Sequence, residues 1–152
     1  MVMGSVVRLP AITLLALSPV ILSTSCSKED DLDEIFRGKT WYITGGCVGG
    51  KVLNTEVKEL YTHADSYYIT FGETTFTGKL AADTFISGAW KANGKERTMS
   101  ITVDEFSNPS GNELSAQLHS ILRMAHGYSG DANILSIEAD AQNFIRLRTT
   151  KM

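Results

Sequence analysis

Several groups of residues in this 152-residue sequence have types and spacings that could support chemistry. The stretch from Gly45 to Lys51 fits the first seven positions of a phosphate-binding loop, G-x-x-x-x-G-K. That chemistry needs a serine or threonine next, to hold magnesium, and the next residue is Val52. We therefore interpret the stretch as a flexible glycine-rich loop between a first strand and a short helix, where glycine supplies positive φ angles.

Three histidines could contribute to a metal site. His119 and His126 share one side of a predicted helix, but two turns separate them by about 10.5 Å. Zinc–nitrogen bonds are only about 2 Å long, so these two residues cannot bind one ion together. His63 is remote in sequence and has only Asp65 as a local carboxylate. We expect no metal site and no cofactor.

Two further groups resemble parts of a hydrolase site. His63, Asp65 and Ser66 are the residue types of acyl transfer, but they are adjacent in the chain and no elbow motif presents the serine. Glu138 and Asp140 could pair as carboxylates, although alternation at the end of a strand explains them equally well. We expect no catalytic residues and no enzymatic activity.

Cys26 has the clearest chemistry, because it ends an N-terminal targeting segment. Arg8 is the only charge of a short n-region, and Leu9 to Leu22 is an apolar run of 14 residues, short of the roughly 20 that span a bilayer. The small residues 23–25 precede the cysteine. This resembles the lipobox of bacterial lipoproteins, although that family usually has leucine at the first of these three positions. The resemblance implies that residues 1–25 are a lipoprotein signal peptide and that Cys26 is lipidated. A chance cysteine after an ordinary signal peptide is the alternative.

An acidic tether is expected over residues 26–35. Its start, Ser27-Lys28-Glu29-Asp30-Asp31, is similar to the lysine-then-acidic signal that sends lipoproteins to the cell surface in some Gram-negative lineages, and it also fits a solvated linker. Two acyl chains anchor a protein stably where one is marginal. We therefore expect an outer-membrane lipoprotein that is displayed at the cell surface. Its partner is the membrane, which it contacts through the N-terminal lipid.

The remaining chain is electrically balanced. From Ile35 onward it has 12 basic and 12 acidic residues, so it offers no basic stripe and we expect no nucleic-acid partner. Cys47 is the only thiol left once Cys26 carries lipid. One cysteine forms no internal disulfide, so the domain must rely on its core.

The body of the chain predicts many short strands and one clear helix. Strand patterns cover residues 39–44, 66–71, 74–80, 83–90, 97–103, 133–138 and 143–148. Asn93-Gly94 is the strongest hairpin-turn signal. The main helix is expected between a capping box over Ser110 to Glu113 and a stop at Gly127, and a weaker one over residues 54–62. The apolar stripe of the main helix consists of Leu114, Leu118, Ile121, Leu122 and Ala125.

Together these elements predict one α+β domain over residues 36–150, built as a curved antiparallel sheet or small β-barrel packed against one main helix. The order of its motifs resembles the META domain of the HslJ-like lipoproteins: Gly88-Ala89-Trp90, Asn93-Gly94, the helix, Tyr128-Ser129-Gly130-Asp131 and two closing strands. Gly38-Lys39-Thr40-Trp41 fits that family's first strand. The resemblance implies a lipoprotein domain of unknown function and supplies no catalytic residues. Lipocalin-like domains, which also begin with a glycine and a tryptophan, are the alternative.

The aromatic residues give the only pointer to a binding surface. Neighbouring residues of a strand face opposite sides, so one member of each pair, Trp41-Tyr42 and Tyr67-Tyr68, is expected to be exposed or to line a groove. We expect a non-enzymatic binding or interaction module whose partner is an envelope protein or a small ligand. A lipocalin-like small-molecule carrier is the alternative. It would need a continuous apolar pocket lined by Tyr67, Ile69 and Met99.

Overall fold

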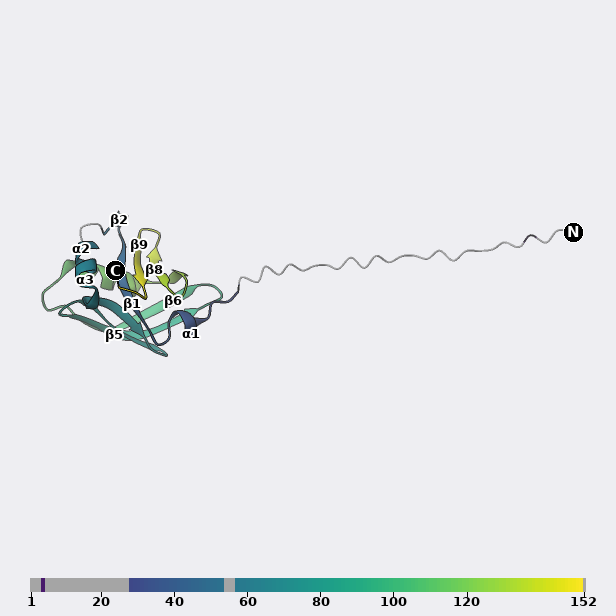
Figure 1. Ribbon diagram of the computed structural model, residues 1–152, viewed down its shortest axis with the longest axis horizontal. Coiled ribbons are helices and arrows are strands. Elements are labelled where there is room, and N and C mark those ends of the chain that lie inside the picture. The colour runs from purple at the N-terminus through teal and green to yellow at the C-terminus, as the bar shows by residue number, and fades with distance from the viewer. Residues whose placement is uncertain (1–3, 5–27, 54–56, 152) are drawn as a thin grey trace.

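Strands that alternate between inward apolar and outward polar residues close into a β-barrel (Figure 1). The computed structural model describes residues 4, 28–53 and 57–151. Within this part of the chain the strands are β1 (Lys39–Val48), β2 (Lys51–Val52), β3 (Tyr67–Phe71), β4 (Thr75–Ala81), β5 (Thr84–Asn93), β6 (Thr98–Ser107), β7 (Gly127–Gly130), β8 (Ile134–Asp140) and β9 (Asn143–Arg148). From β3 onward each strand pairs antiparallel with the next, and β9 pairs back onto β1. Since β1 also pairs with β3, eight strands form the barrel, and the short β2 pairs antiparallel with the end of β1.

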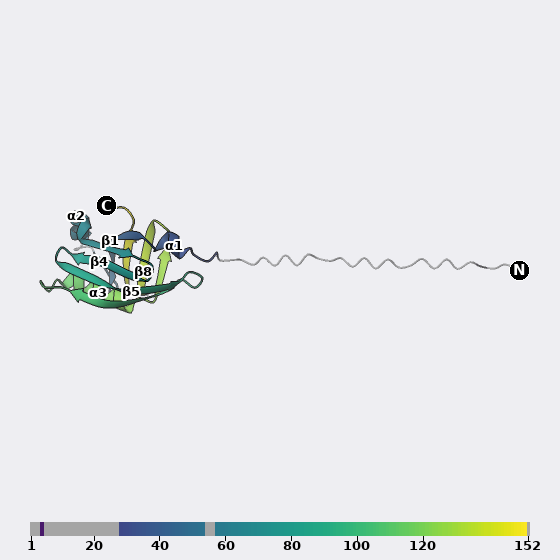
Figure 2. The same cartoon turned by 90° about the horizontal axis from the view of Figure 1, so that it is seen from below.

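A few short helices lie at the two ends of the barrel. The helix α1 (Leu32–Ile35) lies at one end, and α2 (Val57–Thr62) and α3 (Glu113–Met124) lie at the other (Figures 1 and 2). A 3-10 turn over Ala64–Ser66 follows α2. The helix α3 contacts β4, β6, β8 and β9, so it covers the end of the barrel. The predicted barrel is confirmed, with a few short helices in place of a single main one.

The interior of the barrel is the hydrophobic core. Tyr67, Ile69 and Phe71 of β3 all face inward and are at most 1% exposed. The inward residues predicted for the last two strands are fully buried: Leu135, Ile137, Ile145 and Leu147. The apolar stripe of α3 joins the same cluster and closes one end. Each large side chain buried in this way contributes about 1.5–3 kcal/mol.

The prediction of a glycine-rich loop is wrong, because most of the stretch from Gly45 to Lys51 belongs to β1. Residues 45–47 pair with β9 after a bulge between Ile43 and Gly45. A Cβ atom at Gly46 would lie 2.4 Å from the carbonyl oxygen of Phe144, so only glycine allows this close approach. Gly49 and Gly50, with φ angles of 56° and 80°, then form a two-residue hairpin turn to β2.

The ends of α3 also differ from the prediction. Asn112, instead of Ser110, caps the helix, and its Oδ1 accepts a hydrogen bond of 3.0 Å from the backbone N–H of Ser115. Gly111, which has a φ of 64°, lies between Ser110 and this cap. The helix ends at Met124, and Gly127 starts strand β7. The weaker helix is confirmed over residues 57–62, while residues 54–56 lie outside the described part.

Candidate functional site

The structure separates the four predicted binding residues into two inward and two outward side chains. Trp41 and Tyr67 are fully buried in the core. Tyr42 and Tyr68 lie opposite each other on β1 and β3 and face outward, half-buried. The centroids of their two rings are 6.4 Å apart and the ring planes are tilted by 59°. Only Tyr42 and Tyr68 are therefore available to a partner.

The two tyrosines belong to a row of side chains across five strands. On one side of the pair, Tyr68 lies opposite Lys79 of β4, and Lys79 opposite Phe85 of β5. On the other side, Tyr42 lies opposite Arg148 of β9. We call these residues the aromatic row: Arg148, Tyr42, Tyr68, Lys79 and Phe85.

Cations lie over the rings of the aromatic row. The Nζ atom of Lys79 is 5.1 Å from the centre of the Phe85 ring, and that of Lys151 is 5.5 Å from the centre of the Tyr42 ring. Such contacts contribute about 0.5–1 kcal/mol each at exposed sites. Lys151 also pairs with Asp65, and the hydrogen bond to this carboxylate raises the pKa of Lys151. The row and the adjoining Lys151 therefore present aromatic surface together with basic side chains, of which Lys151 is already paired with Asp65.

The aromatic row lies on the outer face of the barrel and borders a shallow cavity. Phe85 is 53% exposed, which is unusual for a phenylalanine. A cavity of about 250 Å³ lies beside Tyr68 and Phe85, with the polar side chains of Thr77, Ser87 and Glu105 on its other sides. Tyrosine and arginine are enriched at the cores of protein interfaces. The surface thus presents apolar rings beside polar and charged groups.

The residues expected to line a carrier pocket are packed in the core. Tyr67, Ile69 and Met99 are at most 4% exposed and belong to one continuous cluster. The phenol of Tyr67 reaches the α2 end, where its hydroxyl donates a hydrogen bond of 3.3 Å to Glu59. The described interior at these three residues is filled by side chains.

Two buried tyrosines should make the fold sensitive to alkali. Burial and then the nearby Glu59 raise the pKa of Tyr67 to about 12, and burial also raises the pKa of Tyr128. Tyrosines of the unfolded chain ionise near pH 10. The stability from these two neutral phenols is complete below about pH 10 and is lost as the pH rises toward their folded pKa values. We expect the urea-unfolding free energy to fall between about pH 10 and about pH 12, and to fall less in Tyr67→Phe. An equal fall in that variant would contradict this assignment.

Of the other residues singled out in the sequence, Glu138 and Asp140 line one cavity of about 450 Å³ together with Ser129 and Ser136, whereas the histidines and Cys47 form no common site among the described residues. His119 stacks on Phe106 with ring centroids 3.8 Å apart, and burial lowers the pKa of His119. His63 lies 3.9 Å from Glu59, and Cys47 is buried. The described residues contain no group of three or more His, Cys, Asp or Glu that could hold a metal ion. Cys26 lies outside the described part, in which no helix has the length and apolar character to cross a membrane.

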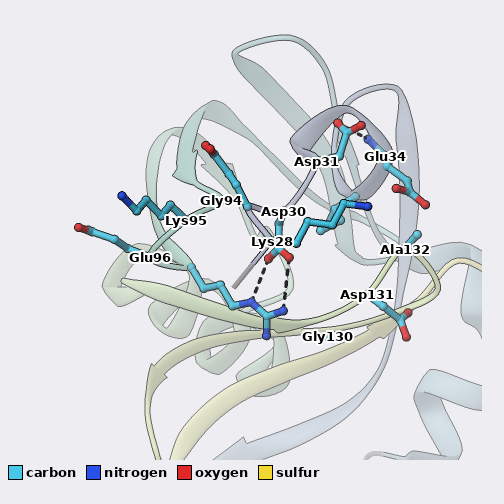
Figure 3. Close-up of a pocket in the computed structure, with 13 residues that line it drawn as sticks. Lys28, Asp30, Asp31, Glu34, Gly94, Lys95, Glu96, Gly130, Asp131 and Ala132 are labelled. Carbon is cyan, nitrogen blue, oxygen red and sulfur yellow. Dashed lines mark hydrogen bonds and ion pairs between the residues drawn. The ribbon is translucent and has the colours of Figure 1, made fainter. Parts of the chain in front are cut away.

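Sequence reasoning missed a second feature, a cavity of about 540 Å³ at the α1 end (Figure 3). It lies between the N-terminal segment, the β5–β6 turn and the β7–β8 turn. In this cavity Asp30 accepts hydrogen bonds from Arg97 and Tyr128, which are 67 and 98 residues away in the chain. No local spacing in the sequence indicates contacts at such separations.

The fold and the surface define this protein as an antiparallel β-barrel domain with an exposed aromatic row. The chain belongs to the family described as "Domain of unknown function (DUF4847)", which it matches over residues 27–148. Its structure is similar to the crystal structure of a DUF4847 family protein from Bacteroides vulgatus, with a TM-score of 0.66 and 24% sequence identity over 80% of this chain and 99% of that one. No curated protein matches it. These findings show the DUF4847 family, and they do not show the META family.

Proposed function

We propose that this protein is a lipid-anchored envelope domain that binds another protein through the aromatic row and has no enzymatic activity. The lipid is attached at Cys26 and holds the protein in the outer membrane. The domain is displayed at the cell surface. The observation that carries the binding role is the outward pair Tyr42 and Tyr68 with cations beside it. The signal peptide and the small residues before Cys26 support the anchor.

The shape of the row favours a protein over a small molecule. Small-molecule sites are concave and bury most of their ligand, whereas the row runs along a barrel wall. Protein interfaces cover about 800 Å² per partner and concentrate their binding energy in a few tyrosine, tryptophan and arginine residues. Lys79, Arg148 and Lys151 would favour a partner with acidic side chains next to apolar ones.

A lipocalin-like carrier is the second candidate, because the barrel architecture is compatible with it. A ligand inside the barrel would have to displace side chains such as Tyr67 and Ile69 from the core. Each displaced side chain would forfeit about 1.5–3 kcal/mol of burial. The exterior row needs no such rearrangement, and we therefore favour it.

The test compares partner recovery by the wild-type protein and by the double variant Tyr42→Ala/Tyr68→Ala. Proteins are cross-linked in intact cells, purified with the barrel and quantified by mass spectrometry. Hot-spot residues contribute about 2 kcal/mol or more each, so specific partners should be recovered at least about tenfold less with the double variant. Circular dichroism checks that the variant is folded.

Thr102→Ala is the matched control, because Thr102 is also exposed on the outer face, on β6 and outside the row. It should leave recovery unchanged. Equal recovery of every partner by the folded double variant would contradict binding through the aromatic row.

A further inference from the structure

One largely buried carboxylate holds the N-terminal segment against the end of the barrel (Figure 3). The side chain of Asp30 is 13% exposed, and its oxygens lie 3.0 Å from Nε and 3.3 Å from Nη2 of Arg97. The hydroxyl of Tyr128 donates a further hydrogen bond of 2.9 Å to Oδ2 of Asp30. A two-point arginine–carboxylate pair fixes orientation as well as distance. We call Asp30, Arg97 and Tyr128 the Asp30 clamp.

The backbone of the β5–β6 turn is shaped around the same residue. The N–H of Asp30 donates a hydrogen bond of 3.0 Å to the carbonyl oxygen of Gly94. A Cβ atom at Gly94 would lie 2.4 Å from the carbonyl oxygen of Asp30, so a larger residue would push the segment away. Arg97 has a φ of 55°, a conformation that residues other than glycine rarely adopt. The main-chain conformation of Arg97 therefore contributes to the clamp.

The chain stays attached to the barrel beyond the clamp. Asp31 caps α1, and its Oδ1 accepts hydrogen bonds from the backbone N–H groups of Asp33 and Glu34. Ile35 is then 5% exposed, and Phe36 is completely buried. The attachment of the chain to the barrel therefore begins at Asp30, within the segment that the sequence pattern assigns to a tether.

Only three residues separate Asp30 from Cys26. Four fully extended steps of the chain cover at most about 14 Å. We infer that the Asp30 clamp holds the α1 end of the barrel against the surface of the lipid bilayer, with the α2 and α3 end facing away from it. This inference rests on the proposed lipid anchor at Cys26.

The chemistry of the α1 end suits the hydrated headgroup layer. The cavity there is lined by charged residues of both signs, among them Lys28, Lys95, Glu34 and Asp131. Charged groups are costly in the acyl region, so this end should rest on the headgroups without inserting. The clamp would then fix which face of the domain is open to partners.

The orientation can be measured on the lipidated full-length protein in phosphatidylethanolamine–phosphatidylglycerol vesicles that carry a headgroup quencher. A fluorophore is attached at Lys95→Cys, at the α1 end, or at Tyr61→Cys on α2, at the opposite end, where the side chain of Tyr61 is 60% exposed. The native Cys47 is 7% exposed, which protects it from labelling. We expect several-fold stronger quenching at position 95 than at position 61.

Two variants test whether the clamp causes this difference. Asp30→Ala should bring the two positions close to equal quenching, whereas Glu29→Ala, which removes a neighbouring carboxylate outside the clamp, should preserve the difference. An insertion of eight Gly/Ser residues after Ser27 leaves the barrel contacts intact and adds about 15 Å of reach, so it should also reduce quenching at position 95.

Co-sedimentation with equal quenching at both positions of the wild-type protein would overturn the clamp alone. A difference that persists in both the folded Asp30→Ala variant and the insertion variant would overturn it as well. Failure of the wild-type protein to co-sediment with the vesicles would overturn the anchor, and this inference with it.

Discussion

Replacing Phe36 with alanine should lower the free energy of unfolding by about 3–5 kcal/mol. The ring is completely buried and lies 5.0 Å from Tyr128 and 5.2 Å from both Phe71 and Trp90, measured between ring centroids. Two of these contacts are edge-to-face, an arrangement that adds about 0.5–1.5 kcal/mol per pair beyond burial. Phe36 thus closes the α1 end, and its removal would leave a cavity among rigid rings.

Urea unfolding of the barrel domain measures this loss. Phe85→Ala is the matched control, because it deletes the same side chain from the outer face, where it is 53% exposed. That variant should lose no more than about 1 kcal/mol, mostly from the contact with Lys79. A similar loss in both variants would mean that the ring of Phe36 does not hold the α1 end closed.

Alternation of apolar and polar residues predicted most of the barrel. In β8 and β9 the inward residues follow a strict period of two and are buried as expected, whereas in β6 the pattern holds for Met99 and Ile101 and weakens at the half-buried Val103. The stripe on α3 repeats with the period of a helix and is buried along its length. Such patterns are strong because each element needs one face in the core.

Features that depend on distant contacts could not be predicted in the same way. The run from Gly45 to Gly50 has the composition of a loop, yet the pairing of β1 with β9 draws its first half into a strand. Strand β7 has only four residues, two of them glycine, and its pairing with β8 is what makes it a strand. Local preference is a weak guide where tertiary pairing decides.

Only part of the candidate site could be predicted, because the rest depends on the pairing of distant strands. Alternation indicated that one member of each aromatic pair would be exposed or line a groove, but it could not say which of Trp41 and Tyr42, or of Tyr67 and Tyr68, would point outward. The register of β4 with β5 and of β9 with β1 places Lys79, Phe85 and Arg148 in the same row. That register is set by the closed barrel and leaves no local signature in the sequence.

The covalent state and location of the mature N-terminus test the central claim, lipid attachment at Cys26, most directly. The wild-type protein should be found in the membrane fraction, with its mature chain starting at a diacylated Cys26 by mass spectrometry. Cys26→Ala should lose the lipid and leave the membrane almost completely, because two acyl chains supply the anchorage.

Cys47→Ala is the matched control, since it removes the other cysteine, which is buried inside the barrel domain. It should remain lipidated and membrane-bound. A Cys26→Ala protein that stays in the membrane fraction, or a wild-type chain whose mature N-terminus carries no lipid, would contradict the account.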